Sequence, residues 1–158
     1  MKDKNIGIGD HFQNETKYKR QSLGGGHTCV SRAEPYKICK DAAVRIDLPE
    51  APIFGGPSLW ETLHRRRSIR EFRNSSITLD QLSRLLWSAN GITLETGGYS
   101  LRTSPSAGAL YPIETYICAN RVAKISSGIY HHNILHNQLE LLKKGNFGGV
   151  LAKACLGQ

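Results

Sequence analysis

Hydrophobic residues recur at the three- and four-residue spacing of a helix in the middle of the chain. They are Leu79, Leu82, Leu85, Leu86 and Ala89. This spacing predicts one apolar helix face directed at a core. Thr78 and Gln81 have the capping-box spacing that begins helices, and Gly91 follows the last hydrophobic position as a typical stop. We therefore expect a helix from about residue 79 to residue 90.

A shorter helix is predicted just before it. Ser58 and Glu61 form a second capping box, and the helix should run to about Arg66 or Arg67. Its hydrophobic positions are Leu59, Trp60 and Leu63. Helices place such residues against a core, so we expect Trp60 to be packed there.

Alternation with a period of two predicts strands in the last third of the chain. Residues 114–119 alternate, and residues 128–132 and 138–142 are two further short runs separated by turn residues. A meander of neighbouring strands is the simplest arrangement. We expect a last helix over residues 147–156, with Asn146 as its cap.

The remaining segments show little periodicity. Residues 92–104, which include Gly97 and Gly98, are predicted to be a loop. Residues 1–56 are predicted to be a lead segment of loops and short strand pieces, and residues 57–158 to form the domain proper. The fold class is α+β, with a mixed sheet flanked by helices.

Composition is typical of one globular domain. The chain has 158 residues, of which 39% are hydrophobic and 22% charged. The sequence has no apolar run that approaches the roughly 18 residues of a membrane span, and its start does not resemble a signal peptide. We predict a cytoplasmic protein without a membrane partner.

The four cysteines are widely spaced, so we expect reduced thiols.

Basic residues are concentrated at the end of the first predicted helix. The formal net charge is +8, and Arg66, Arg67, Ser68 and Arg70 lie close together. Each guanidinium can bind two phosphate oxygens at once, and the serine adds a hydroxyl donor. This pattern is compatible with a phosphate site. A solvated basic face or a nucleic-acid-binding patch is the alternative.

A second unusual stretch is the bend RTSPSAGALYP at 102–112. Its small residues would let the main chain approach a flat ring closely, and main-chain N–H groups at a helix start could donate to that ring. Candidate ring contacts are Ser104, Pro105, Ser106, Ala107 and Gly108. We expect Tyr111 to be a core anchor. An ordinary helix-to-strand loop is the alternative.

Three histidines are candidate metal ligands. His131, His132 and His136 lie in the region that alternates as strands. Adjacent residues of a strand point to opposite faces, so the first two cannot converge on one ion. We therefore predict no metal site. Glu114, which follows the bend, is interpreted as a strand-edge carboxylate.

Two motifs in this order resemble the nitroreductase superfamily. The sequence RRSIREF is followed about 35 residues later by TSPSAGALYPIE. LDQLSRLLWSANGIT, SSGIYHH and LELLKKG are similar to the second helix and strand pair of the SagB-type dehydrogenase branch. This branch includes the oxidases that convert peptide thiazolines and oxazolines to azoles.

The resemblance implies an oxidoreductase with non-covalent FMN that passes hydride through flavin N5. It implies that Arg66, Arg67, Ser68 and Arg70 hold the phosphate and ribityl chain. It also implies that Pro105, Ser106, Ala107 and Gly108 line the isoalloxazine, with Ser104 beside them. The protein's own part would be to position and tune the flavin.

The resemblance further implies a homodimer with the flavin at the subunit boundary and no nucleic-acid partner. Family members continue past the helix at 147–156 with more flavin contacts and, in azole-forming members, a lysine–tyrosine pair for proton abstraction. We expect this sequence to be a fragment, a truncated product or part of a split protein, and we name no catalytic residue. An inactive remnant or a scaffold subunit without chemistry is the alternative.

Overall fold

The computed structural model describes residues 7–17, 34–52, 54–97 and 99–157. The chain divides into two units, Met1–Ala33 and Glu34–Gln158. The first unit contains α1 (Ile8–Thr16). The second contains, in order, β1 (Arg45–Asp47), α2 (Leu59–Arg65), α3 (Leu79–Asn90), β2 (Ile92–Thr96), β3 (Tyr99–Arg102), the 3-10 turn η1 (Ala107–Ala109), β4 (Tyr116–Ala119), β5 (Gly128–Asn133), β6 (Gln138–Lys144) and α4 (Gly148–Ala154).

The main sheet has four strands in the order β1-β6-β5-β4, and all neighbours are antiparallel. Strands β4, β5 and β6 form the meander that the alternation predicted. Strand β1 pairs with β6 and comes from the residues we assigned to the lead segment. An isolated parallel bridge joins Ile77 to Val122. The α+β class predicted from the sequence is confirmed.

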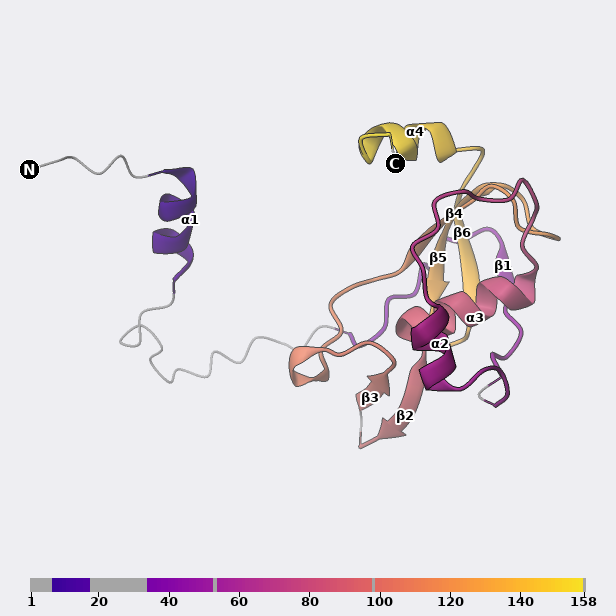
Figure 1. Ribbon diagram of the computed structural model, residues 1–158, viewed down its shortest axis with the longest axis horizontal. Helices are drawn as coiled ribbons and strands as arrows, with labels where there is room; N and C mark the ends of the chain where they lie inside the picture. The colour runs from indigo at the N-terminus through magenta and orange to yellow at the C-terminus, as the bar shows by residue number, and fades with distance from the viewer. Residues whose placement is uncertain (1–6, 18–33, 53, 98, 158) are drawn as a thin grey trace, which may run out of the picture. The chain divides into compact units, whose positions relative to one another are not determined.

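Helix α3 lies against this sheet (Figure 1). The hydrophobic core consists of Leu48, Leu82, Leu86, Ala119, Tyr130 and Leu139. Burying each large apolar side chain stabilises the fold by about 1.5–3 kcal/mol. Leu85 was predicted to share the apolar face, but it is exposed. Ser83 is buried instead, and its hydroxyl donates to the carbonyl of Pro49.

Both ends of α3 are set by the residues that the sequence indicated. Gln81 N donates to Thr78 Oγ1 at 3.2 Å, and Thr78 N donates to Gln81 Oε1 at 2.9 Å. At the other end, a Cβ atom on Gly91 would lie 2.6 Å from the carbonyl oxygen of Trp87. The φ of Gly91, −68°, is open to any residue, so backbone conformation does not require glycine there. Close packing against Trp87 does.

The prediction of a loop over residues 92–104 is wrong. Strands β2 and β3 form an antiparallel hairpin in which Thr96 pairs with Tyr99. Ile92-Thr-Leu-Glu-Thr96 has the β-branched and alternating character of a strand. The glycine pair was a hairpin signal that we interpreted as a loop signal.

Helix α2 has the predicted start but not the predicted packing. Ser58 Oγ accepts a hydrogen bond from Glu61 N at 3.2 Å, but the reciprocal bond of the predicted capping box is not formed, and Glu61 Oε1 instead lies 3.2 Å from Arg65 Nη1. No residue of α2 is buried, however, and Trp60 is 79% exposed. Residues 54–76 are all exposed, so none of the described residues covers the apolar face of α2. The IREF stretch that follows forms no strand.

The ends of the chain differ modestly from expectation. Helix α1 occupies residues predicted to be loop or strand, and Gly7 N donates to Asp10 Oδ2 at 3.0 Å at its start. In α4, Asn146 Oδ1 accepts from Gly148 N at 3.1 Å, although the helix is shorter than predicted. None of the helices described has both the length and the apolar character needed to cross a bilayer.

Candidate functional site

The small-residue bend forms a single 3-10 turn with left-handed backbone. Gly108 has φ 63° and ψ 18°, and Ala109 has φ 51°. Glycine adopts this region without the steric cost that a Cβ atom adds. The amide N–H groups of Ala107 and Gly108 make no hydrogen bond to the described residues. The predicted helix start is thus one short turn with unused donors.

Side-chain hydrogen bonds shape the bend from within. Ser104 Oγ donates to Asn90 Oδ1 at 2.9 Å, which ties the bend to the end of α3. Tyr111 N donates to Ser106 Oγ at 2.8 Å and closes the turn. We expected both serine hydroxyls to contact a ring, and each is instead already engaged in one internal bond. Each keeps further hydrogen-bonding capacity, because a hydroxyl can both donate and accept.

The bend borders a small hollow. The hollow has a volume of about 250 Å³ and is lined by Ala89, Asn90, Ser104, Pro105, Ser106, Tyr111, Pro112, Ile113 and Thr115. Ser104, Pro105 and Ser106 thus share one concave surface. Ala107 and Gly108 are exposed and do not line it.

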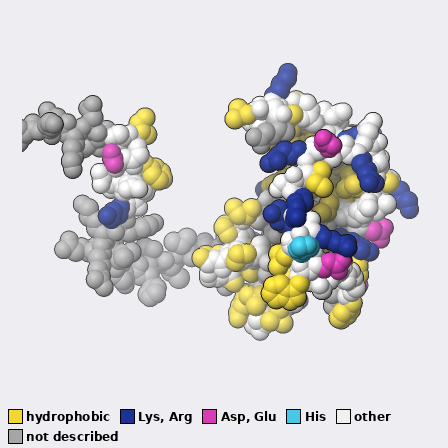
Figure 2. Space-filling model, in the orientation of Figure 1, with side chains coloured by type: hydrophobic (Ala, Val, Ile, Leu, Met, Phe, Trp, Pro, Cys, Tyr) yellow, Lys and Arg dark blue, Asp and Glu magenta, His cyan; other side chains and the backbone are white. Residues whose placement is uncertain are grey.

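The arginine cluster lies at the end of α2 on the molecular surface. Arg66 is the C-cap, and Arg67 Nη1 donates to the carbonyls of His64 and Arg66 at 2.9 and 2.8 Å. Among the described residues, Arg66 and Arg70 make no side-chain hydrogen bond or ion pair, and Ser68 is exposed beside them. Figure 2 shows hydrophobic and basic side chains together on the face that carries α2.

The structure does not join the two predicted groups. No hydrogen bond or ion pair between described residues links the arginine cluster to the bend. The cluster lies on α2 and its extension, whereas the bend is tied to α3 and β3. Assignment of both groups to one ligand therefore stays a prediction.

Sequence reasoning missed a buried ionic cluster next to the bend. His131 Nδ1 lies 2.9 Å from Glu140 Oε2, and His131 Nε2 lies 3.0 Å from Glu114 Oε2. The side chains of His131 and Glu140 are 0% exposed. His131 and Glu140 are directly paired across β5 and β6. Registering the two predicted strands against each other would have brought them together.

Opposing effects act on the Glu140 carboxyl. Burial alone would raise the pKa of Glu140, but hydrogen bonds from His131, the Cys39 amide and Asn133 outweigh it and lower this pKa to about 2. The Cys39 thiol is different: burial and the nearby Glu140 raise its pKa. Glu140 is therefore a carboxylate at neutral pH, and Cys39 is a thiol.

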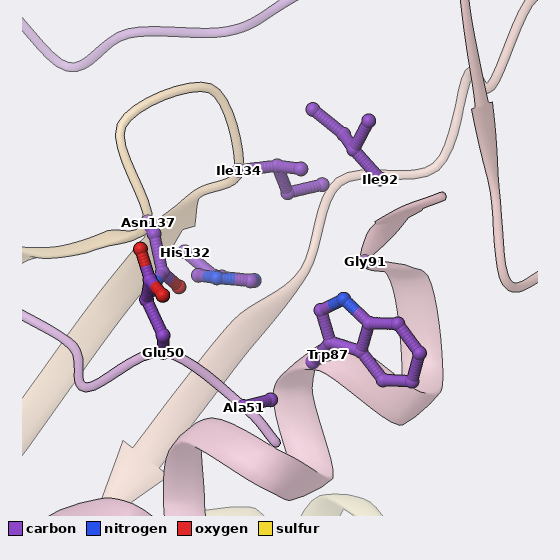
Figure 3. A pocket seen from close by; sticks show the side chains of 8 residues that line it. All are labelled: Glu50, Ala51, Trp87, Gly91, Ile92, His132, Ile134 and Asn137. Carbon is purple, nitrogen blue, oxygen red and sulfur yellow. The ribbon is translucent and has the colours of Figure 1, made fainter. Parts of the chain in front are cut away.

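His132 points away from this cluster toward a cavity of about 260 Å³ (Figure 3). In that view its ring lies between Asn137 and the Trp87 indole. Neither ring nitrogen has a hydrogen-bond partner among the described residues. Burial lowers the pKa of His132 to about 4, and the nearby Asn137 amide opposes this only in part. His132 is therefore neutral at pH 7.

Comparison with known proteins identifies the relatives of this chain. The model of the Nitroreductase family matches residues 63–152. A predicted nitroreductase of Methanocaldococcus jannaschii is 37% identical over 100 residues, which are 63% of this chain and 49% of that protein. The trifolitoxin-processing protein TfxB of Rhizobium leguminosarum bv. trifolii is 37% identical over 49 residues, which are 30% of this chain and 13% of TfxB.

Two solved structures share the fold. A predicted nitroreductase from Anabaena variabilis has a TM-score of 0.61 at 24% identity, covering 93% of this chain and 28% of its own. A second, from Ralstonia eutropha, has a TM-score of 0.56 at 32% identity, covering 73% of this chain and 51% of its own.

The chain therefore spans about half the length of the Methanocaldococcus relative, and far less of TfxB. Its helices and antiparallel sheet match the nitroreductase-like fold of the solved structures. The family model covers more than half of this chain and includes both predicted ligand-contacting groups. This chain belongs to the nitroreductase family.

Proposed function

We propose that this chain is part of an FMN-dependent oxidoreductase of the SagB-type dehydrogenase branch. The observation that carries the proposal is the hollow beside the bend, which a family member would need for a flat cofactor. Ser104, Pro105 and Ser106 line it, and their side chains are small enough to leave room for a ring edge. Small residues with unused main-chain donors suit a ring that carries carbonyl oxygens and nitrogens.

The ring end of FMN would be held by the bend. The free N–H groups of Ala107 and Gly108 can donate to acceptors on the ring, and the left-handed turn presents them without a bulky side chain at Gly108. The internal bonds of Ser104 and Ser106 fix this shape before a ligand binds. A pre-shaped site loses less conformational entropy on binding than a flexible one.

The phosphate end would be held by the arginine cluster. Arg66 and Arg70 have no competing acidic partner among the described residues, so their donors are available for phosphate oxygens. Arg67 is used in part to cap α2, which fixes the backbone from which the cluster projects. When bound, the flavin supplies the two-electron chemistry through its N5 position.

We propose that the substrate is an azoline-containing peptide. Two observations support it: the resemblance of RRSIREF and TSPSAGALYPIE to the SagB-type branch, and the similarity to a trifolitoxin-processing protein. The described residues provide no acid or base that we assign to this reaction. The chain's own proposed role is to bind and orient the cofactor.

A homodimer is proposed as the working assembly. Leu59, Trp60, Leu63, Ile69 and Phe72 are exposed on and after α2, and Trp60 and Phe72 are 79% and 86% exposed. Large apolar surfaces of this kind are typical of protein interfaces. A second copy covering this face would also shield the arginine cluster from water, which strengthens its contacts to phosphate.

The alternative is an inactive remnant or scaffold that binds no flavin. Purification in the presence of FMN separates the two. The proposed oxidoreductase retains a yellow chromophore after gel filtration, and the chromophore bleaches on reduction. A colourless, folded protein would favour the scaffold.

A further inference from the structure

The His131 cluster connects three separate segments of the chain. His131 belongs to β5, Glu140 to β6, and Glu114 to the segment that leaves the bend. The two nitrogen–oxygen distances are 2.9 and 3.0 Å. Glu114 is the only partly exposed member, at 26%.

Hydrogen bonds engage both ring nitrogens of His131. Nδ1 faces a Glu140 oxygen and Nε2 faces a Glu114 oxygen, so the ring is held in one orientation from both sides. Arg45 Nε lies 3.7 Å from Glu140 Oε1. The Asn133 amide donates to the same carboxylate at 2.9 Å.

Glu114 lies where the chain that leaves the bend joins the main sheet. The bend is tied to α3 through Ser104 and to β3 through Tyr111. Pro112 and Ile113 are exposed and make no hydrogen bond to the described residues. Glu114 is therefore the first residue after the bend that is bonded to the main sheet. The backbone bond from His132 N to Thr115 O, at 2.9 Å, follows immediately.

We propose that Glu114, His131 and Glu140 form a clamp that fixes the bend to the sheet and thereby positions the main chain that contacts the cofactor. The inference rests on the proposed function. His131 and Glu140 supply a rigid, fully buried anchor, and Glu114 transmits its position to the bend. All three are positioning residues, because none of them lines the hollow beside Ser104.

A metal site is the competing use of these side chains. Ligand atoms of Cys39, His131 and Glu140 lie within 4.8 Å of one another. The hydrogen bonds argue against it, since both His131 nitrogens and the nearer Glu140 oxygen already have partners. A metal ion would have to displace the His131 proton and the contacts of Glu140. The clamp needs no such rearrangement.

The direct test measures amide hydrogen exchange in variants of Glu114. Glu114→Ala should speed exchange at Ala109 and Tyr111 by about tenfold or more, while amides of β5 and β6 keep their protection. Glu114→Gln keeps an acceptor for His131 and should restore exchange to within about threefold of the wild type. Glu95→Ala, which removes an exposed carboxylate on β2, is the control. Unchanged exchange in Glu114→Ala would overturn the clamp.

Nitrogen-15 NMR of labelled histidine supplies an independent readout. The clamp predicts that added zinc leaves the ring-nitrogen shifts of His131 unchanged, because both nitrogens are already hydrogen-bonded. A zinc-dependent shift of one ring nitrogen, abolished by Cys39→Ser, would overturn the proposal in favour of a metal site.

Flavin affinity links the clamp to the proposed function. Glu114→Ala should raise the Kd for FMN by about tenfold, and Glu114→Gln should bind nearly as well as the wild type. If the wild type binds no FMN, the proposed function fails, while the exchange and NMR results still decide the clamp. If Glu114→Ala binds FMN like the wild type, the positioning role is wrong.

Discussion

Tyr111 contacts Arg102 in two ways at the entrance to the bend. The Tyr111 hydroxyl accepts a hydrogen bond from Arg102 N at 2.9 Å, and the Arg102 guanidinium lies 4.6 Å from the centre of the Tyr111 ring. Tyr36 lies 5.5 Å from the same guanidinium. Arg102 is 8% exposed and has no acidic partner among the described residues, so its charge is stabilised by the two rings and by a hydrogen bond from Nη2 to the Pro35 carbonyl at 3.3 Å.

The first prediction concerns the Tyr111 hydroxyl. Tyr111→Phe keeps the ring beside Arg102 but leaves the Arg102 amide without its acceptor. Loss of such a bond at a largely buried donor should lower the free energy of unfolding by about 1–3 kcal/mol. Urea denaturation measures this. Tyr99→Phe, at a half-exposed tyrosine with no hydroxyl partner among the described residues, should change it by less than about 0.5 kcal/mol.

The second prediction concerns acid sensitivity. The pKa of His132 is lowered from 6.5 to about 4 on folding, so the unfolded chain binds the proton first. Stability should therefore fall as the pH drops from about 6.5 to 4, with a loss of about 2 kcal/mol by pH 5. Glu140, whose pKa is lowered to about 2, adds a further loss below about pH 4.5.

Substitution of His132 isolates this effect. His132→Gln should flatten the stability profile between pH 7 and pH 5, whereas His136→Gln, at an exposed position, should leave the wild-type slope. The two profiles come from urea titrations at each pH. Equal slopes in wild type and His132→Gln would contradict the assigned origin of the acid sensitivity.

The third prediction concerns two glycines. Gly91→Ala places a Cβ atom 2.6 Å from the Trp87 carbonyl oxygen, and the resulting overpacking should cost about 1–3 kcal/mol of stability. Gly149 in α4 has open space around it, so Gly149→Ala should be neutral or stabilising by up to about 1 kcal/mol. Thermal unfolding distinguishes the two. An unchanged stability in Gly91→Ala would show that the end of α3 can shift to accommodate the added methyl group.

The fourth prediction concerns the exposed apolar surface on and after α2. Trp60→Ser should change the free energy of unfolding of the monomer by less than about 0.5 kcal/mol, because the side chain is 79% exposed. If α2 forms the dimer interface, the same change should raise the dimer Kd by about tenfold or more. Sedimentation equilibrium tests this, with Leu156→Ser, at an exposed leucine just past the end of α4, as the control. Identical association of wild type and Trp60→Ser would exclude α2 from the interface.

Local signals in the sequence predicted much of the fold. The side-chain cap at Ser58, the capping box at Thr78 and the stop at Gly91 were predictable, because helix ends depend on neighbouring residues. Period-two alternation located β4, β5 and β6. The hairpin at 92–102 was missed because glycine favours both irregular loops and the tight turns of hairpins.

Features that depend on distant contacts were not predictable in the same way. The apolar face of α2 indicated burial, but amphipathicity does not say what covers a helix, and no described element covers this one. The bonds of Ser104 and Ser106 depend on where α3 ends and how the turn closes. Glu114 resembled an edge carboxylate until β5 brought His131 beside it.

We propose that the arginine cluster and the small-residue bend hold the two ends of FMN. Titration of the purified protein with FMN, followed by quenching of flavin fluorescence, tests it most directly. The wild type should saturate, and Arg70→Ala and Gly108→Val should each raise Kd by about tenfold or more, through a lost charge-assisted bond and a strained left-handed residue. Arg84→Ala, at an exposed arginine on α3, should stay within about twofold of the wild type. No binding by the wild type, or equal Kd values for wild type, Arg70→Ala and Gly108→Val, would contradict this mode of FMN binding.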